Sequence, residues 1–256
     1  MSTIALVGNP NSGKTTLFNA LTGSNQHVGN WPGVTVEKKE GNLKFNEKTY
    51  NIVDLPGTYS LGAFSEDEIV ARDFILKGNP NIVINVVDST NIERNLYLTT
   101  QLLEMGAKVV VALNMIDEAK ARNIDVDIEA LSKKLGAPVV PTVASKRKGI
   151  DELVRKCIEL MDDDTDYKAH ISYGDNIDKE IEKLKDFLSD KNLEYPTQWI
   201  AIKLLEGDEY VHELIRSNED LNSSTDLINT IHRFKQNRED YELEIIDKRY
   251  EFISSI

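Results

Sequence analysis

A run of residues near the start of the sequence is typical of a phosphate-binding loop. Residues 8–15 read Gly-Asn-Pro-Asn-Ser-Gly-Lys-Thr, which fits the pattern GxxxxGK[ST]. A strand-like apolar run precedes the motif and a helical pattern begins at Lys14, so the motif stands in the context it requires. Loop N–H groups and the positive end of the helix dipole would then hold phosphate oxygens. We expect nucleotide contacts from Gly8, Asn9, Pro10, Asn11, Ser12, Gly13, Lys14, Thr15 and Thr16.

Two residues of this loop and a second motif predict a magnesium site. Lys14 would reach the β- and γ-phosphates of a nucleotide, and the Thr15 hydroxyl would bind Mg²⁺. The second motif, Asp54-Leu55-Pro56-Gly57, ends a predicted strand, on the side of an open parallel sheet that faces the ligand crevice. We expect Asp54 to hold Mg²⁺ through water and the Gly57 N–H to meet the γ-phosphate.

Base choice is predicted from Asn114-Met115-Ile116-Asp117, which matches the guanine motif NKxD except that Met115 replaces Lys. The Asp117 carboxylate would accept hydrogen bonds from N1–H and N2–H₂ of guanine, and adenine cannot offer this arrangement. Met115 can still cover the base by apolar contact. Further along, Val143-Ala144-Ser145-Lys146 resembles a SAK motif, in which we expect the Ala144 N–H to bind guanine O6. The order of these motifs predicts a domain that binds GTP and GDP.

Thr35 is the candidate for a switch residue. It lies in the Asn- and Gly-rich segment 25–36, before the second predicted strand, where GTPases place the threonine that binds Mg²⁺ only in the GTP state. Such a segment can order and disorder with the γ-phosphate. We therefore expect Thr35 to act in hydrolysis together with Asn11, Lys14 and Gly57.

The residues after Gly57 lack the glutamine with which Ras-like proteins orient the attacking water, because Thr58 and Tyr59 stand there. Hydrolysis is then either slow or assisted by another group. In a subset of these GTPases a loop Asn helps to bind K⁺ at the position of an arginine finger. Asn11 is the candidate, with backbone carbonyls around Gly29 and Trp31 completing the site. The alternative is that Asn11 only stabilises the turn of the loop.

These motifs require a sheet that places them at its strand ends. Strands are predicted over Thr3–Val7, Val36–Phe45, Thr49–Asp54, Ile82–Asp88, Lys108–Asn114 and Pro138–Thr142, and helices over Lys14–Thr22, Ser65–Leu76, Ile92–Met105, Asp127–Leu135 and Gly149–Met161. Strand–helix alternation predicts an α/β fold with a mostly parallel sheet covered on both faces. The second and third strands are too close for a helical crossover and should form a hairpin. We therefore expect a six-stranded mixed sheet with one antiparallel edge strand.

The pattern changes to a helical one after residue 162. The acidic break Asp162–Asp166 is followed by helical spacing in Ile177–Leu188 and Trp199–Leu205, without strand-like alternation. Further helices are predicted over Asp208–Arg216, Ser224–Phe234 and Arg238–Ser254. The expected domains are therefore 1–162, which binds the nucleotide, and 163–256, a small all-helical domain.

The composition limits the partners of this chain. Of its 256 residues 40% are hydrophobic and 29% charged, and the formal net charge is -13. So acidic a surface argues against nucleic acid or anionic lipid as the main partner. Cys157 is the only cysteine, which precludes an internal disulfide and fits a reducing cytoplasm. No apolar run approaches the roughly 20 residues that span a bilayer, so we expect a soluble chain.

The first switch and its surroundings resemble the prokaryotic ferrous-iron transport protein B family. The resemblance rests on residues 28–37, 54–61 and 66–73, and Met115 also fits. It implies a Ras-like GTPase fold and a helical tail that acts as a spacer and strengthens GDP binding. With the missing glutamine and Asn11, we expect slow, Mg²⁺-dependent GTP hydrolysis that K⁺ accelerates. In full-length members these domains precede a membrane domain that passes Fe²⁺, so the chain is expected at the cytoplasmic face of the membrane, with that permease domain as partner.

Two other readings remain open. A ribosome- or RNA-associated GTPase shares the phosphate loop but would normally carry a basic appendage, whereas the second region here is acidic. A nucleotide-sensing module with negligible turnover is supported by the missing glutamine. Binding of guanine nucleotide is common to all readings, and a homo-oligomer stays open in each.

Overall fold

The computed structural model describes residues 1–23, 26–62, 65–163, 171–189, 191, 193–222 and 225–256. The chain divides into two compact units: Met1–Leu103, Ala107–Ala169 and Ile256 form the first, and Glu104–Gly106 and His170–Ser255 the second. The expected domain boundary after residue 162 stays a prediction. Asp164–Asp166 of the acidic break, Asn25 of the switch segment and Ser224 of an expected helix lie outside the described residues.

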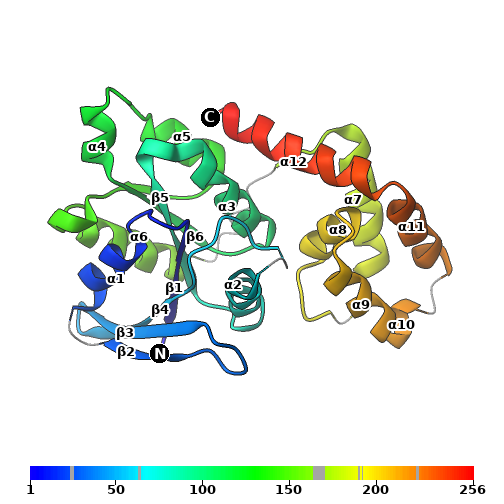
Figure 1. Ribbon diagram of the computed structural model, residues 1–256, viewed down its shortest axis with the longest axis horizontal. Coiled ribbons are helices and arrows are strands. Elements are labelled where there is room, and N and C mark those ends of the chain that lie inside the picture. The colour runs from blue at the N-terminus through cyan, green and yellow to red at the C-terminus, as the bar shows by residue number, and fades with distance from the viewer. Residues whose placement is uncertain (24–25, 63–64, 164–170, 190, 192, 223–224) are drawn as a thin grey trace. The chain divides into compact units, whose positions relative to one another are not determined.

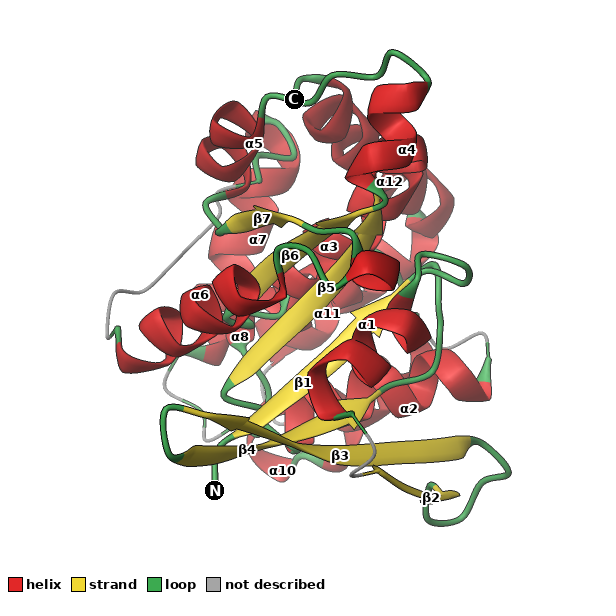
Figure 2. Cartoon of the chain, turned by 90° about the vertical axis from the view of Figure 1, so that its left-hand side faces the viewer, coloured by secondary structure: helices red, strands yellow, loops and turns green. Residues whose placement is uncertain are grey.

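The first unit is built on a seven-stranded sheet in the order β2-β3-β4-β1-β5-β6-β7 (Figures 1 and 2). Its strands are β1 (Thr3–Gly8), β2 (Gln26–Asn30), β3 (Glu37–Phe45), β4 (Lys48–Asp54), β5 (Ile82–Asp88), β6 (Val109–Asn114) and β7 (Val139–Pro141). Strands β4, β1, β5, β6 and β7 pair in parallel, whereas β3 is antiparallel to β4 and β2 is antiparallel to β3. All residues of β6 are buried, which is why this strand reads as a continuous apolar run.

The prediction of six strands was short by one, because β2 was not expected. The antiparallel edge strand is β2, and β3 lies one position further in. β2 reads Gln-His-Val-Gly-Asn, and four of its five residues are exposed, so its side chains carry no alternation of apolar and polar types. Backbone pairing with β3, from Gln26 opposite Gly41 to Asn30 opposite Glu37, defines the strand.

Helices cover both faces of the sheet. They are α1 (Lys14–Thr22), α2 (Glu66–Lys77), α3 (Ile92–Glu104), α4 (Ile116–Ala121), α5 (Ile128–Leu135) and α6 (Ile150–Asp162), with two short 3₁₀ helices, η1 (Ser89–Asn91) and η2 (Ala144–Lys146). Figure 2 shows α1 and α6 on one face, where Phe18 and Leu153 belong to one buried cluster with Leu6 of β1. On the other face the Thr99 hydroxyl of α3 accepts a hydrogen bond from Asn85 Nδ2 of β5 at 2.7 Å. The helix α4 was not predicted because it has only six residues.

Helices are the only regular secondary structure among the described residues of the second unit. It contains α7 (Asp175–Leu188), α8 (Thr197–Leu205), α9 (Glu209–Ser217), α10 (Glu219–Asn222), α11 (Thr225–Gln236) and α12 (Arg238–Ser254) (Figure 1). Every residue of α8 from Trp199 to Leu205 is buried, so this helix lies at the centre of the unit. The four-residue α10 was not predicted. No helix in the described part of the chain is both long enough and apolar enough to cross a membrane.

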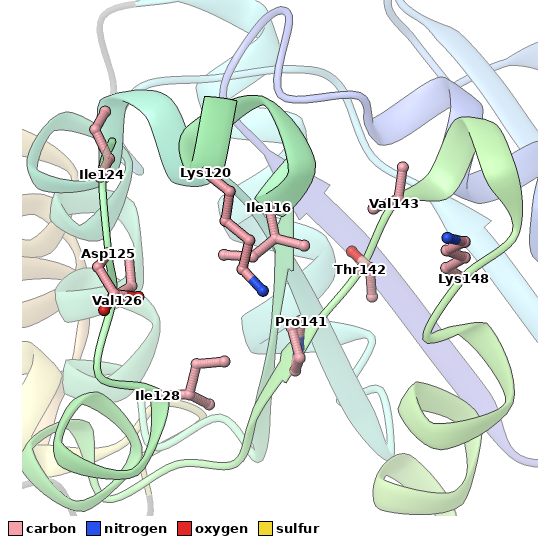
Figure 3. Close-up of a pocket in the computed structure, with 10 residues that line it drawn as sticks. All are labelled: Ile116, Lys120, Ile124, Asp125, Val126, Ile128, Pro141, Thr142, Val143 and Lys148. Carbon is pink, nitrogen blue, oxygen red and sulfur yellow. The ribbon is translucent and has the colours of Figure 1, made fainter. Parts of the chain in front are cut away.

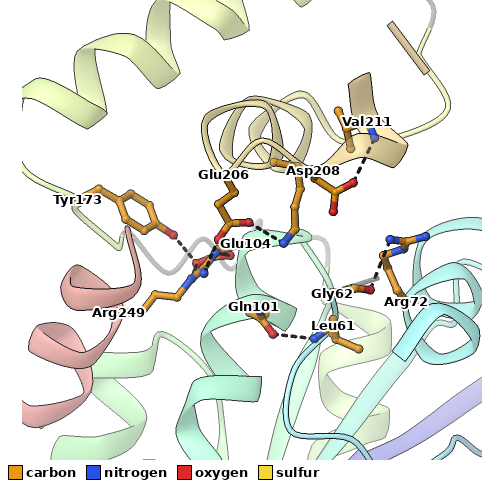
Figure 4. A network of polar contacts seen from close by, with 11 residues as sticks. Leu61, Gly62, Arg72, Gln101, Glu104, Tyr173, Glu206, Asp208, Val211 and Arg249 are labelled. Carbon is orange, nitrogen blue, oxygen red and sulfur yellow. Dashed lines mark hydrogen bonds and ion pairs between the residues drawn. The ribbon is translucent and has the colours of Figure 1, made fainter. Parts of the chain in front are cut away.

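A buried polar cluster stabilises this second unit (Figure 4). Arg249, 1% exposed, donates to both carboxylate oxygens of Glu104 at 2.7 Å and to Glu206 at 2.5 Å. Lys203 donates to the other oxygen of Glu206 at 2.6 Å, and the Tyr173 hydroxyl donates to Glu104. Burial alone would raise the pKa of Glu206, but the charges of Arg249 and Lys203 lower that pKa to about 2. Loss of Arg249 would leave two buried carboxylates without their main counter-charge.

Candidate nucleotide-binding site

The predicted phosphate loop joins β1 to α1 in a conformation that depends on its glycines. A Cβ atom on Gly8 would lie 2.7 Å from the Val86 carbonyl oxygen, so β1 and β5 can approach only with glycine there. Asn11 and Gly13 have φ values of 67° and 86°, in the left-handed region. Gly13 caps α1 without a side-chain hydrogen bond, which leaves the first-turn N–H groups of this helix open to an anion.

Two polar atoms of the loop fit a ligand that offers hydrogen-bonding groups. Asn9 and Ser12 are 3% and 1% exposed, and neither Asn9 Oδ1 nor Ser12 Oγ has a hydrogen-bond partner among the described residues. Buried polar atoms are ordinarily paired, and unpaired ones cost free energy. The Ser12 hydroxyl can donate to a phosphate oxygen, so together with the open first turn of α1 it suits a phosphate-bearing ligand. Asn9 Oδ1 can only accept, from water or from an N–H or O–H group of a ligand.

Lys14 and the second motif lie together beside the loop. Lys14 Nζ is 2.5 Å from Asp54 Oδ1, and both side chains are largely buried. Burial raises the pKa of Asp54, and the positive charge of Lys14 opposes this rise. Gly57 packs on the loop, because a Cβ placed on it would lie 3.6 Å from Pro10. The neighbouring Thr58 N–H donates to the Gly8 carbonyl at 3.3 Å. The structure thus brings the predicted phosphate and magnesium residues of both motifs into one place.

Asn114 connects the guanine motif to two other loops. It is 3% exposed, and its Nδ2 donates to the Ser12 carbonyl at 3.0 Å. Its Oδ1 accepts from the Ala144 N–H at 3.0 Å and from the Thr142 hydroxyl at 3.3 Å. A Cβ on Gly13 would lie 2.2 Å from Asn114 Nδ2, so a glycine is required where these loops meet. Thr142 was not predicted as a site residue, because only the structure shows its hydrogen bond to Asn114.

The Ala144 N–H has a partner within the protein, so its expected bond to guanine stays a prediction. This N–H was predicted to bind guanine O6, but in the structure it donates to Asn114 Oδ1. The next amide, that of Ser145, has no acceptor among the described residues, and Ser145 is exposed. Ser145 is therefore a further candidate for a backbone donor to the base.

Asp117 and Lys146 form an ion pair that the sequence did not predict. Lys146 Nζ is 2.6 Å from Asp117 Oδ2, and the two side chains are 60% and 36% exposed. The hydrogen bond from Lys146 lowers the pKa of Asp117, so the carboxylate is a hydrogen-bond acceptor at neutral pH. Met115 adopts the left-handed conformation at the start of α4, and its Cε lies 3.4 Å from the position of a Cβ on Gly13. Met115 thus reaches the phosphate loop.

Thr35 lies apart from the other magnesium candidates. Residues 31–36 form the tip of the β2–β3 hairpin, closed by a hydrogen bond from the Trp31 N–H to the Val36 carbonyl at 2.9 Å. Thr35 is exposed there, and no contact within the described residues joins it to Thr15 or Asp54. The same holds for the potassium candidates, because Asn11 is exposed and has no described contact with Gly29 or Trp31. The Trp31 ring instead packs edge-on against Phe74 at 5.3 Å.

The segment that follows Gly57 is fixed by contacts with α3. Thr58 is 4% exposed, and its hydroxyl donates to the carbonyl two residues ahead at 2.6 Å. The Leu61 N–H donates to Gln101 Oε1 at 2.8 Å (Figure 4). Tyr59 is 43% exposed, and its ring lies 4.2 Å from the Arg94 guanidinium. The Thr58 side chain is therefore not free to orient the attacking water.

A small cavity of about 320 Å³ borders the guanine motif (Figure 3). Ile116 and Lys120 of α4 line one side, and Pro141, Thr142 and Val143 line another. It includes Thr142, which belongs to the hydrogen-bond set of Asn114. The remaining lining residues come from the loop after α4, from Ile128 at the start of α5 and from Lys148, too scattered in sequence to be predicted as a group.

Clusters of three or more His, Cys, Asp or Glu side chains that could hold a metal ion are absent from the described residues. The magnesium candidates are of another kind, because they combine the hydroxyls of Thr15 and Thr35 with the single carboxylate of Asp54. A magnesium ion bound mainly by hydroxyls, water and phosphate would need no such cluster.

Comparisons with known proteins cover both units. The family model Ferrous iron transport protein B matches residues 2–157, and the FeoB cytosolic helical domain model matches residues 173–256. The chain is 42% identical over 258 residues to the Fe(2+) transporter FeoB of Salmonella typhimurium and 43% identical over 263 residues to that of Escherichia coli K12. Each alignment covers 99% of this chain and 32% of the relative, so the chain spans about a third of the length of these relatives.

Solved structures agree with this result. The cytosolic domain of the T. maritima FeoB iron transporter in a GDP form has a TM-score of 0.87 and 42% identity, covering 100% of this chain and 96% of that one. The GMPPNP form of the same domain has a TM-score of 0.88 and 42% identity, covering 100% and 97%. The fold is thus a Ras-like α/β domain with a helical domain.

Proposed function

The chain belongs to the ferrous iron transport protein B family, and from this membership we propose that it binds and hydrolyses GTP to control Fe²⁺ uptake by an attached membrane domain. The observation that carries the proposal is the position of Asn114, which joins the phosphate loop, the guanine motif and residues 142–144 in one hydrogen-bonded set. Relatives that are 42% identical are described in GDP and GMPPNP forms, which supports a guanine nucleotide as the ligand.

The phosphates would be held by backbone and by one lysine. The first turn of α1 has open N–H groups, the Ser12 hydroxyl of the loop is unpaired and able to donate, and Lys14 lies at the end of the loop. Lys14 would turn from Asp54 toward the β- and γ-phosphates, which offer it more negative charge. The Gly57 N–H, beside Pro10, would then meet the γ-phosphate.

The base would be recognised by Asp117, with Ser145 and Met115 in support. The ionised Asp117 carboxylate accepts hydrogen bonds only, which matches N1–H and N2–H₂ of guanine. Lys146 already shields this carboxylate at 2.6 Å and is exposed enough to move aside. The Ser145 N–H would donate a hydrogen bond to guanine O6, and Met115 would cover the base from the side of Gly13.

Metal ions would complete the hydrolytic site. The Thr15 hydroxyl and Asp54 would hold Mg²⁺, and the tip of the β2–β3 hairpin would bring Thr35 to it with GTP bound. Asn11 and the carbonyls of Gly29 and Trp31 would hold K⁺. When bound, the two ions would offset negative charge on the phosphates as the γ-phosphoryl group is transferred.

The test is steady-state GTP hydrolysis with Mg²⁺, in K⁺ and then in Na⁺ at equal ionic strength. We expect phosphate release that is faster in K⁺, and we expect Asn11→Ala to remove this difference while keeping GDP affinity. Asn46→Ala is the matched control, because Asn46 is also exposed and left-handed, with φ 46°, but lies in the β3–β4 turn. Equal rates in both salts would refute the K⁺ site.

A nucleotide-sensing module without turnover is the second candidate function. The buried Thr58 favours it, because its hydroxyl is already bonded and is not free to orient the attacking water. Tight GDP binding with no phosphate release in either salt would select this reading. In a full-length transporter, Lys14→Ala should then still lower Fe²⁺ uptake, because nucleotide binding itself would be lost.

A further inference from the structure

The outer edge of β2 is an open sheet edge. β2 ends the sheet, and no segment among the described residues pairs with its outer side. In an antiparallel pair, every second residue of a strand forms its backbone hydrogen bonds with the neighbouring strand. The hydrogen bond from the Trp31 N–H to the Val36 carbonyl shows which residues of β2 do so with β3. Gly29 and His27 therefore direct their backbone groups toward β3, whereas Gln26, Val28 and Asn30 direct theirs outward. Val28 in the middle of the strand is 65% exposed.

The other end of the sheet is protected against strand addition. β7 has only three residues and ends in Pro141, which lacks an N–H. Gly149 covers the Pro141 carbonyl, because a Cβ on that glycine would lie 2.2 Å from the carbonyl oxygen. Proteins commonly block edges with prolines, charges, bulges or short strands. β2 has five residues, no proline and no charged residue, so it carries none of these blocks.

The hairpin is also free of the charge that would keep copies of this protein apart. The chain carries a formal net charge of -13, whereas residues 26–40 contain only Lys38, Lys39, Glu37 and Glu40, which sum to zero. These four residues pair within β3, Lys38 with Glu40 at 2.8 Å and Lys39 with Glu37 at 2.6 Å. Two copies can therefore approach along β2 without like-charge repulsion at the contact.

We propose that β2 pairs antiparallel with β2 of a second copy of this chain, centred on Val28. In this register Val28 faces Val28, and Gln26 faces Asn30 in both halves of a two-fold interface. All three outward-directed residues then exchange backbone hydrogen bonds with the partner. The side chains that meet are valine with valine and amide with amide, so no like charges face each other across the pair. So short an interface predicts a weak, concentration-dependent dimer.

Cysteine cross-linking tests the register directly. Val28→Cys would place two thiols opposite each other, with Cα atoms about 5.5 Å apart, within the range that a disulfide bridges. Asn30→Cys is the matched control on the same face, because the two copies of residue 30 would lie four residues apart along the strands, about 13 Å. The native Cys157 is fully buried, and burial raises the pKa of its thiol, so it contributes no background.

In a glutathione buffer, we expect about tenfold or more disulfide dimer from Val28→Cys than from Asn30→Cys, because pairing raises the local thiol concentration. In sedimentation velocity without new cysteines, Val28→Lys should abolish the concentration-dependent dimer, and the neutral Val28→Thr should keep it. Equal cross-linking of the two cysteine variants, a dimer that survives Val28→Lys, or a monomer at every concentration would each overturn the proposal. The variants should fold normally, because the Val28 side chain is mostly in solvent.

Discussion

Replacing Asn114 with alanine removes the side chain that joins three loops of the site. Three hydrogen bonds are lost: from Nδ2 to the Ser12 carbonyl at 3.0 Å, and to Oδ1 from the Ala144 N–H at 3.0 Å and the Thr142 hydroxyl at 3.3 Å. At about 1 kcal/mol for each, the free energy of unfolding should fall by about 3 kcal/mol. The three partners are left in a buried place, so this value is a lower bound.

Thermal unfolding of the nucleotide-free chain measures this loss without the contribution of a ligand. For a chain of this size about 3 kcal/mol corresponds to a fall in Tm of about 6–12 °C for Asn114→Ala. Thr142→Val is the matched control, since it removes only one of the three bonds and should lower Tm by about 2–4 °C. Release of a fluorescent GDP analogue should also be accelerated by Asn114→Ala, and less by Thr142→Val.

A Tm for Asn114→Ala within about 1 °C of the wild type would refute the role of Asn114 as the common partner of the loops, since a shift of about 2–4 °C is expected for each kcal/mol lost. This role would also be refuted if Thr142→Val were as damaging as Asn114→Ala. Either result would mean that the loops are held by other contacts and that Asn114 is not their common partner.

Three further outcomes follow from the geometry. Gly13→Ala should abolish GDP binding in a calorimetric titration while the chain stays folded, because its Cβ would lie 2.2 Å from Asn114 Nδ2 at a φ of 86°. Arg249→Met should lower the free energy of unfolding by about 3–5 kcal/mol in urea titrations, because Glu104 and Glu206 lose a buried counter-charge. The depressed pKa of Glu206, about 2 against an ordinary 4.5, contributes stability that is present above pH 4.5 and lost as the pH falls toward 2, so Glu206→Gln should flatten acid unfolding in that window.

Much of the fold could be predicted because its signals are local. The apolar runs of β5 and β6 and the helical spacing from Lys14 onward reflect burial, which the side chains themselves encode. β2 could not be predicted in this way, because an exposed strand is held by backbone pairing and its side chains carry no periodic pattern. The short α4 and α10 were missed because four to six residues are too few for a period to show.

The residues of the candidate site likewise fall into those with a local sequence signal and those without one. The phosphate loop, Asp54 and Asp117 could be proposed from the sequence because their spacing is tied to their chemistry. The hydrogen bond from the Ala144 N–H to Asn114 Oδ1 was not predicted, because the two residues are 30 apart in sequence. The pairing of Lys146 with Asp117 spans 29 residues and was missed for the same reason. Contacts between separate loops depend on the fold, so no local sequence pattern predicts them.

The central claim is that this site binds guanine nucleotides and that Asp117 recognises the base. Its most direct test is calorimetric titration of the nucleotide-free chain with GDP and then with ADP. We expect GDP to bind at least about 1,000-fold more tightly than ADP, because adenine leaves a carboxylate acceptor unmet and presents its own acceptor N1 to it. Asp117→Asn should remove most of this preference. ADP binding within about tenfold of GDP, a difference of only about 1.4 kcal/mol, would contradict the claim.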